Sequence, residues 1–451
     1  MKDINKISIF NKTLLISAIL LELGLVSTQA ATINVDGTTC NLTDAITSAN
    51  TDAAIGGCIT GNGDDTLNLS SNGTFTLNSQ LPNITSNTTI NCNDSSISRN
   101  PAAGTNFRIL TIYSSTVEVN NCIISNGIDS ENYSGGIYIN GGSLSINDST
   151  ISNNTQGAIL FENTTNSAIN NSTISNNTAS NDAYYGGGIN IASSEVTISN
   201  STISHNSSLS TRTYAGGGGI YIQNLLSDAS VLIENSTIFS NNSSYRGGAI
   251  SHRDYYGSST SLIIKNTTIS GNSSSQMGGA LAFDSINAEL VNTTITNNSS
   301  ANSGGALFLN DNGAVTITQS ILTGNSAITT GNEINLVSGT ITVNNRNIFG
   351  FNNNSGISGF TIGVTDIIPT VALASILDTT LALNGGTTKT HALVAGSPAI
   401  DAVLSTNCIT TNDQRGVTRP QDGDNNTIAD CDIGALEHVF ITDLIFKNGF
   451  E

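Results

Sequence analysis

The stretch that decides the fold is "STISNN", which occupies Ser149–Asn154 and returns unchanged at Ser172–Asn177. Near-copies begin at Ser201 ("STISHN"), Thr267 ("TTISGN") and Thr293 ("TTITNN"). The aliphatic residue at the centre of each copy recurs every 23 to 35 residues, at Ile124, Ile151, Ile174, Ile203, Ile238, Ile269, Ile295 and Leu322. A repeat of this length is typical of solenoids.

Two further β-prone segments lie between successive copies. One follows a diglycine, as in "GGIYI" at Gly135 and Gly218, "GGINI" at Gly187 and "GGAL" at Gly304. The other precedes the copy, as in "SLSIND" and "EVTISN". Strands this short bury a core only by stacking, at about 4.8 Å per turn.

These patterns predict an all-β protein, a right-handed parallel β-helix (solenoid) with N-terminal and C-terminal caps. No helical segment separates the strands, which excludes a doubly wound sheet. A propeller would need longer, hairpin-linked strands and a steadier period.

Two rows of polar residues follow the same period. Because asparagine tolerates a left-handed backbone and its amide both donates and accepts, each row is predicted to form an amide ladder along the rod. The first row is Asn171, Asn200, Asn235, Asn266 and Asn292, with Asp148 and Gln319 at equivalent positions. The second is Asn154, Asn177, Asn206, Asn272, Asn298 and Asn325.

Composition and the N-terminus point to export. Only 10% of the 451 residues are charged and the net charge is −19, so the chain lacks the basic stripe that nucleic-acid binding requires. Three lysines precede the apolar run Leu14–Val26, and small residues follow it, which predicts a signal peptide over residues 1–30. A retained membrane anchor is the alternative; after signal cleavage no transmembrane span remains.

The cysteine count also fits an exported protein. All six lie after the signal, and proximity favours pairing in order of occurrence: Cys40–Cys58, Cys92–Cys122 and Cys408–Cys431.

Residues 31–95 are predicted to form the N-terminal cap. Leu42, Ile46 and Ala49 recur at helical spacing in "CNLTDAITSAN" (Cys40–Asn50), and Asn41 or Thr43 could cap that helix. This segment resembles the CSLREA-type motif of exported bacterial β-helix proteins, with Thr43-Asp44 where that motif has Arg-Glu. Residues 96–350 are then the β-helix repeats.

Residues 351–437 resemble a choice-of-anchor Q domain. The resemblance rests on "GSPAIDA" (Gly396–Ala402), "TNDQRGVTRP" (Thr411–Pro420) and "CDIGALE" (Cys431–Glu437). It implies a secreted or cell-surface bacterial protein. The diglycine turns also resemble polymorphic outer-membrane protein repeats, although those carry Phe-x-x-Asn where this chain has Ile-Ser-x-Asn. Residues 438–451 form a C-terminal tail, whose end resembles short "FxxGFE" export tails.

The richest cluster of functional groups is "SHRDYYG" (Ser251–Gly257). Counting from each diglycine places Arg253 and Asp284 as charged neighbours on adjacent turns. The candidate ligand-binding residues are Tyr245, His252, Arg253, Asp254, Tyr255 and Asp284. The ligand class is polysaccharide or a host or cell-surface glycan, and the alternative is a surface ion pair beside a loop. Tyr133, Tyr185 and Tyr245 share one offset before the diglycine and predict a stacked aromatic row.

Neither a catalytic set nor a resident cofactor is indicated. Hydrolysis needs two converging carboxylates and uronate elimination needs a base with calcium or arginine, and no such set recurs in one column. Alternating oxygen donors suit calcium at Asp422, Asp424, Asn426 and Asp430; a solvated, disulfide-bridged loop is the alternative. We therefore expect a non-enzymatic, adhesin-like or glycan-contacting protein. The alternatives are a polysaccharide lyase or glycoside hydrolase, and a passive spacer.

Overall fold

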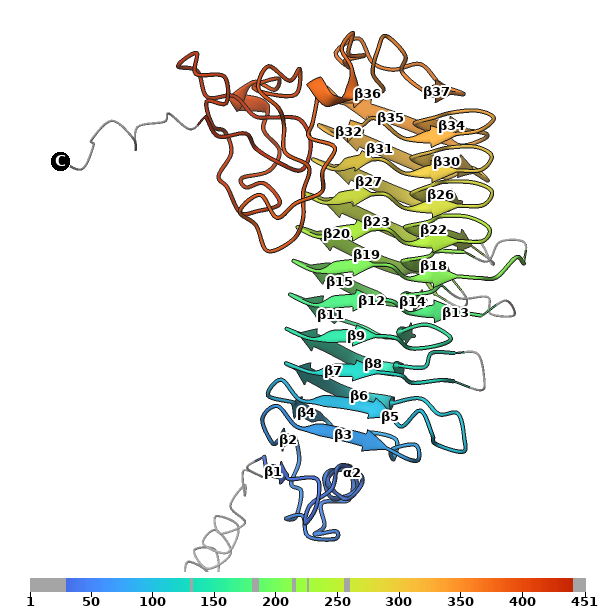
Figure 1. Ribbon diagram of the computed structural model, residues 1–451, viewed down its shortest axis with the longest axis vertical. Helices are drawn as coiled ribbons and strands as arrows, with labels where there is room; N and C mark the ends of the chain where they lie inside the picture. The colour runs from blue at the N-terminus through green and yellow to red at the C-terminus, as the bar shows by residue number, and fades with distance from the viewer. Residues whose placement is uncertain are drawn as a thin grey trace, which may run out of the picture.

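A computed structural model describes residues 30–129, 133–180, 186–212, 216–224, 227–254 and 260–440. It shows an all-β, right-handed parallel β-helix of about 10 turns, as predicted (Figure 1). The predicted signal peptide, apart from Ala30, and most of the predicted tail lie outside the described residues. Among the residues described, no helix has the length and apolar character needed to cross a membrane.

The strands of the rod stack in parallel and form three sheets. A 20-stranded sheet begins with β1 (Thr32–Val35), β2 (Asp65–Leu69), β4 (Thr88–Asn91) and the long strands β6 (Leu110–Asn120) and β8 (Ile137–Asn147). It then divides into two columns. One contains β10 (Ile159–Glu162), β14 (Ile189–Ala192), β18 (Ile220–Asn224), β22 (Ile250–Asp254), β26 (Leu281–Asp284), β30 (Leu307–Asn310), β34 (Ile334–Leu336) and β37 (Ile357–Ser358). The other contains β11 (Ser167–Asn170), β15 (Glu195–Ser199), β19 (Ala229–Glu234), β23 (Thr260–Lys265), β27 (Asn287–Val291), β31 (Ala314–Thr318) and β35 (Thr340–Asn344).

The repeated "[ST]TI" segments form the 11-stranded sheet. Its strands are β3 (Thr74–Leu77), β5 (Ser96–Arg99), β7 (Ile123–Ser125), β9 (Thr150–Ser152), β12 (Thr173–Ser175), β16 (Thr202–Ser204), β20 (Thr237–Phe239), β24 (Thr268–Ser270), β28 (Thr294–Thr296), β32 (Ile321–Leu322) and β36 (Ile348–Phe349). The register aligns Ile151 with Ile174 and Ile174 with Ile203, and all eight predicted column residues are buried in the core. The predicted hydrophobic column is confirmed.

A third, 6-stranded sheet was not predicted from the sequence. It consists of two-residue strands made by the small residues after each "[ST]TI" copy: β13 (Thr178–Ala179), β17 (Ser207–Ser208), β21 (Asn242–Ser243), β25 (Ser273–Ser274), β29 (Ser299–Ser300) and β33 (Ser326–Ala327). Serine and threonine have little apolar periodicity, so these strands depend on the stacking of their neighbours.

One of the two predicted asparagine ladders is present. Each Nδ2 of the second row donates to the Oδ1 of the next turn at 2.8–3.0 Å, from Asn154 through Asn177, Asn206, Asn241, Asn272 and Asn298 to Asn325. Asn241 also belongs to this row, although the predicted row omitted it: it follows Ile238 by three residues, as Asn154 follows Ile151. The buried carboxyl group of Glu333 ends the ladder, and its Oε2 accepts from Asn325 Nδ2 at 2.6 Å.

The first row is not an amide ladder, which corrects the prediction. Its members do have a left-handed backbone, with φ between +44° and +51° at all seven positions. The contact between turns is made instead by the serine or threonine that directly follows each of these residues. Ser149 N donates to Ser172 Oγ at 3.0 Å, and Ser172 N donates to Ser201 Oγ at 3.1 Å. The asparagine side chains are thereby free to face outward at the corner of the rod.

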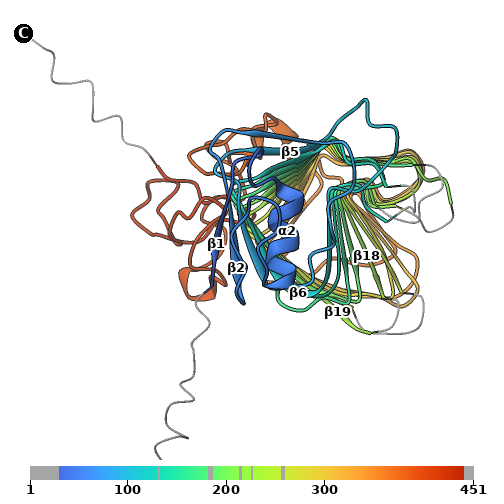
Figure 2. The same ribbon diagram turned by 90° about the horizontal axis from the view of Figure 1, so that it is seen from below.

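The N-terminal end of the rod is closed by helix α2 (Leu42–Thr51), which lies across its opening (Figure 2). Asn41 caps it, because Asn41 Oδ1 accepts from Asp44 N at 2.9 Å. Leu42, Ile46 and Ala49 are buried, as the helical spacing predicts. The parallel stacking already starts at β1, ahead of this helix, so the strands of residues 31–95 are part of the rod.

The C-terminal region covers the side of the rod rather than only its end. Residues 350–371 close the end, where Ile348 pairs with Ile367. The C-terminal lobe, residues 372–440 with two 3-10 turns at Leu373–Ser375 (η1) and Ser405–Asn407 (η2), folds back along the 11-stranded sheet (Figure 1). Thr237, Thr268 and Thr294 of that sheet each hydrogen-bond to the lobe. The six cysteines form Cys40–Cys58, Cys92–Cys122 and Cys408–Cys431, the pairs that proximity favours.

Candidate functional site

The predicted ligand-binding cluster does not form a common surface. His252 aligns with Ile222 and Phe283 in the core, and its ring nitrogens contact the Asp284 carbonyl oxygen at 2.6 Å and Thr260 Oγ1 at 2.8 Å. Burial lowers the pKa of His252 to about 4, so the ring is neutral at physiological pH. The side chain is therefore part of the interior and does not lie on a surface that a ligand could reach.

Asp284 is also buried, and it pairs with a different arginine from the one predicted. Arg246 Nη2 donates to Asp284 Oδ1 at 2.8 Å and Arg246 Nη1 contacts Asp284 Oδ2. Counting along the strands found Arg253 but missed Arg246, which reaches Asp284 from the loop before the diglycine. Tyr245, Arg253 and Asp254 are half-buried and Tyr255 lies outside the described residues.

A different group of side chains gathers on the face formed by β6, β8 and β10. We call it the tyrosine patch: Tyr113, Tyr133, Tyr138, Asn140 and Glu162. The register aligns Tyr113 with Asn140 and Asn140 with Glu162, so the three lie on successive turns. Asn140 Nδ2 donates to Glu162 Oε2 and contacts Tyr138 Oη, both at 3.1 Å. The Tyr138 hydroxyl also donates to Glu162.

The rings of the patch pack against one another. Tyr133 stacks on Tyr138 with centroids 5.4 Å apart, and Tyr113 meets the edge of Tyr138 at 6.0 Å. Tyr138 is buried, whereas Tyr113 is 39% exposed. Tyr113 therefore offers a ring held in place by its neighbours.

Arg108 packs against the buried side of the tyrosine patch. Its guanidinium lies 4.7 Å from the Tyr138 ring centroid, and its Nη2 is 3.1 Å from Asp129 Oδ1 in a buried ion pair. Burial, followed by the hydrogen bond to Glu162, raises the pKa of Tyr138 well above its usual value, so the phenol keeps its proton and donates. The patch is thus preorganised before any ligand arrives.

The sequence pattern did not predict the tyrosine patch. Tyr133 was placed in a row with Tyr185 and Tyr245, but in the structure it stacks on Tyr138 of the same turn; Tyr185 lies outside the described residues. Glu162 was not among the candidate residues. A single glycine, Gly157, precedes β10 where other turns have a diglycine, so a count along the chain from that glycine is displaced by one residue from the observed Asn140–Glu162 register.

The acidic loop of the C-terminal lobe brings together two of the four predicted metal ligands. Asp422 and Asp424 each place a carboxylate oxygen within 4.8 Å of one from Asp401, which the sequence pattern did not include. Asn426 Nδ2 donates to Asp424 Oδ2 at 3.0 Å. Asp430 turns away and accepts from Ser405 N at 2.7 Å, so it is not part of this cluster.

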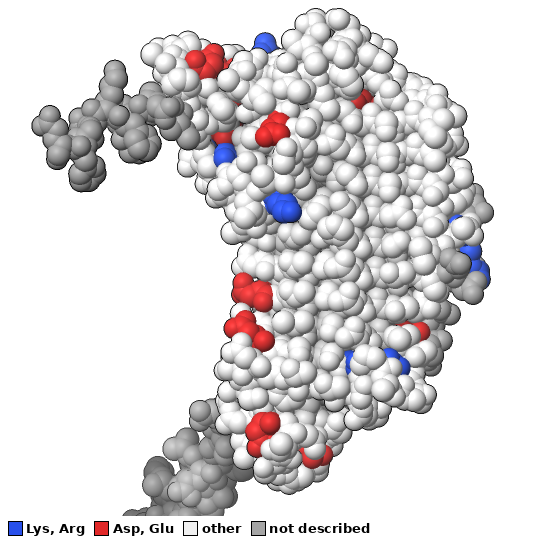
Figure 3. Space-filling view, in the orientation of Figure 1, with Lys and Arg blue, Asp and Glu red and all other residues white. Residues whose placement is uncertain are grey.

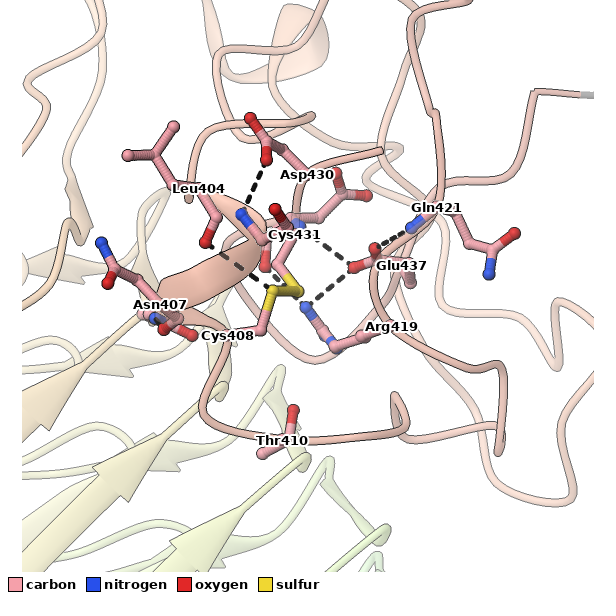
Figure 4. Close-up of a disulfide and its surroundings, with 12 residues drawn as sticks. Leu404, Asn407, Cys408, Thr410, Arg419, Gln421, Asp430, Cys431 and Glu437 are labelled. Carbon is pink, nitrogen blue, oxygen red and sulfur yellow. Dashed lines mark hydrogen bonds and ion pairs between the residues drawn. A yellow bond between two sulfur atoms is a disulfide. The ribbon is translucent and has the colours of Figure 1, made fainter. Parts of the chain in front are cut away.

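A buried charge network holds the rest of the lobe together (Figure 4). Arg419 Nη1 lies 2.9 Å from Glu437 Oε2, and both side chains are buried. Glu437 Oε1 also accepts from Gln421 N at 2.9 Å, beside the Cys408–Cys431 disulfide. The residues of "TNDQRGVTRP" and "CDIGALE" therefore act in packing the lobe.

Comparison with known proteins agrees with the fold. Residues 108–255 match the family described as the right handed beta helix region. Residues 292–310 match the Chlamydia polymorphic membrane protein repeat, in agreement with the resemblance of the diglycine turns. No curated protein matches the chain. Among solved structures the chain is similar to the pectate lyase Pel9A, at 14% identity and a TM-score of 0.48, over 83% of this chain and 88% of that one. The CSLREA-like and choice-of-anchor Q-like resemblances stay predictions.

Proposed function

We propose that this protein is an exported β-helix protein without catalytic activity, which contacts polysaccharide or cell-surface glycan through the tyrosine patch. The observation that carries the proposal is the alignment of Tyr113, Asn140 and Glu162 on three successive turns. An aromatic face packs on the C–H groups of a sugar ring, while an amide and a carboxylate bond its hydroxyls.

The surface setting supports the same proposal. Only 10% of the residues are charged, and the face of the rod shown in Figure 3 is mostly uncharged, so a neutral glycan on the rod meets little charge to desolvate. The match to the polymorphic membrane protein repeat favours a cell-surface or secreted location, together with the three disulfides.

A polysaccharide lyase or glycoside hydrolase is the second candidate. Within the described part of the patch, Glu162 is the carboxylate nearest the surface, since Asp129 is buried against Arg108. A hydrolase would need a second carboxylate opposite Glu162. The patch as described suits binding better than cleavage.

The test is binding and turnover on a panel of neutral and uronic-acid polysaccharides, with and without calcium. Tyr113→Ala should weaken binding by about 1 kcal/mol, a roughly five-fold rise in Kd. Tyr245→Ala is the matched control, because it removes a half-buried tyrosine of the predicted cluster. If the wild type generates new chain ends in a polysaccharide and Glu162→Gln does not, the protein is an enzyme that uses Glu162, and the binding proposal is wrong. A Kd unchanged in Tyr113→Ala would place binding outside the patch, and no binding to any polymer would leave the spacer.

A further inference from the structure

A cleft of about 430 Å³ lies where the C-terminal lobe overhangs the corner of the rod. The rod side is lined by the outward-facing asparagines Asn171, Asn200, Asn235 and Asn266, and the lobe side by residues 410–416 with Thr387. None of these residues belongs to the tyrosine patch.

The lobe docks on this asparagine corner one turn at a time. Gln319 Nε2 donates to the Asn407 carbonyl oxygen at 2.7 Å, Asn292 Oδ1 accepts from Thr410 Oγ1 at 3.2 Å, and Asn266 Nδ2 donates to the Asn412 carbonyl oxygen at 3.0 Å. The cleft begins where these contacts to the asparagine side chains stop; at the next turn Thr388 Oγ1 donates to the Asn235 carbonyl oxygen at 3.0 Å and leaves the Asn235 side chain in the cleft lining. Asn235, Asn200 and Asn171 continue the same corner, with φ of +51°, +48° and +49°.

One buried group in the cleft lacks a partner. Asn266 is 5% exposed, and its Oδ1 accepts no hydrogen bond within the described residues. Because this atom has almost no accessible area, a ligand in the cleft meets the amides of the neighbouring turns instead.

The charges of the cleft are balanced. Arg415 Nη2 lies 2.7 Å from Asp413 Oδ2, and Glu234 and Lys265 are register partners on β19 and β23. The lining is made of amide and hydroxyl side chains, one glycine, and two acidic and two basic side chains, without an apolar side chain. A peptide would need apolar or aromatic anchors, and an anionic polymer would need an excess of cations.

We propose that this cleft binds a neutral oligosaccharide that runs along the corner of the rod. Adjacent turns are about 4.8 Å apart, so a chain crossing three turns meets one asparagine amide on each. The amides of Asn171, Asn200 and Asn235 donate to and accept from its hydroxyls. The site is separate from the tyrosine patch and does not depend on it.

The test uses the full mature chain and neutral gluco-, manno- and galacto-configured oligosaccharides, with oligogalacturonate as the anionic probe, in titration calorimetry. Asn200→Gly and Asn235→Gly remove the amide while glycine keeps the left-handed backbone. Each should raise the Kd about five-fold, the effect of one lost hydrogen bond. Asn163→Gly is the matched control, because Asn163 has φ +52° on the same turn as Asn171 but lies at the other corner.

Thr387→Val tests the lobe side without touching the rod, so the result does not depend on the folding of the glycine variants. Binding that is lost in Tyr113→Ala but unchanged in Asn200→Gly, Asn235→Gly and Thr387→Val would place the ligand on the patch and overturn this proposal. Tighter binding of oligogalacturonate, or no binding of any neutral probe at millimolar concentration, would overturn it too.

Discussion

Thr268 of β24 donates through Oγ1 to Gln414 Oε1 at 2.6 Å, although 146 residues separate them in the sequence. Gln414 Nε2 donates in turn to Thr237 Oγ1 of the neighbouring turn at 3.1 Å and to Thr388 Oγ1 at 2.9 Å. One buried amide thus joins two turns of the rod to the lobe. The outward threonine of the "[ST]TI" repeat serves as its docking position.

Replacing Thr268 by valine should loosen the lobe. The change keeps a β-branched side chain but leaves the buried Gln414 Oε1 without its donor, which costs about 1–3 kcal/mol. We expect faster hydrogen exchange in residues 405–416 and a lower midpoint in urea. Thr202→Val is the control, because Thr202 holds the same position on β16, which the lobe does not cover. Equal exchange in both variants would contradict the docking role of Thr268.

The sequence predicted the rod because its core depends on period alone. A buried isoleucine on each turn needs no distant partner to be recognised, and the same holds for helix α2 and the buried asparagine row. The lobe was predicted as a cap because nothing in "TNDQRGVTRP" indicates that Gln414 contacts Thr237 and Thr268. Such contacts join segments whose spacing along the chain carries no pattern.

The candidate sites were less predictable for the same reason. Arg246 bonds Asp284 on the next turn, and Tyr138 bonds Glu162 on the next turn. Because a single glycine precedes β10 where other turns have two, a count along the chain misplaces Glu162 by one residue relative to the true strand register. Counting along the chain cannot detect either relationship. Strand register must be known before side chains on adjacent turns can be paired.

Asn241 is the central member of the amide ladder, and replacing it should show how much the ladder contributes to stability. Its Nδ2 donates to the Ile203 carbonyl oxygen at 2.9 Å and to Asn272 Oδ1 at 3.0 Å, and its Oδ1 accepts from Asn206 N at 2.9 Å. Asn241→Leu leaves several buried groups unpaired, so the free energy of unfolding should fall by at least about 3 kcal/mol. Denaturant unfolding measures it, with exposed Asn242→Leu as the control. A loss as small as that of the control would show that the ladder contributes little.

Glu333 should make the stability of the rod depend on pH. Burial raises its pKa from 4.5 to about 8. Between these values the folded state holds a proton that the unfolded state has released, so the free energy of unfolding falls as the pH rises from about 4.5 to 8. Thermal unfolding of Glu333→Gln across this range should show a weaker decline than the wild type. Asp432 and Glu437, whose pKa values burial also raises, are unchanged in both proteins and cancel in the comparison. Parallel curves would contradict the role of Glu333.

Calcium is expected to stabilise the C-terminal lobe through Asp401, Asp422 and Asp424. Burial and the nearby Asp424 carboxylate raise the pKa of Asp401, and Asp401 Oδ1 has no hydrogen-bond partner in the described residues. A divalent cation among these oxygens would offset their repulsion, and binding to the folded state alone adds about 2.7 kcal/mol at a hundredfold excess over Kd. Calcium should therefore raise the melting temperature, and a chelator should reverse the effect. Asp424→Asn should reduce the shift, whereas Asp430→Asn should keep it because Asp430 bonds Ser405 instead. Equal shifts in the two variants would mean that calcium acts elsewhere.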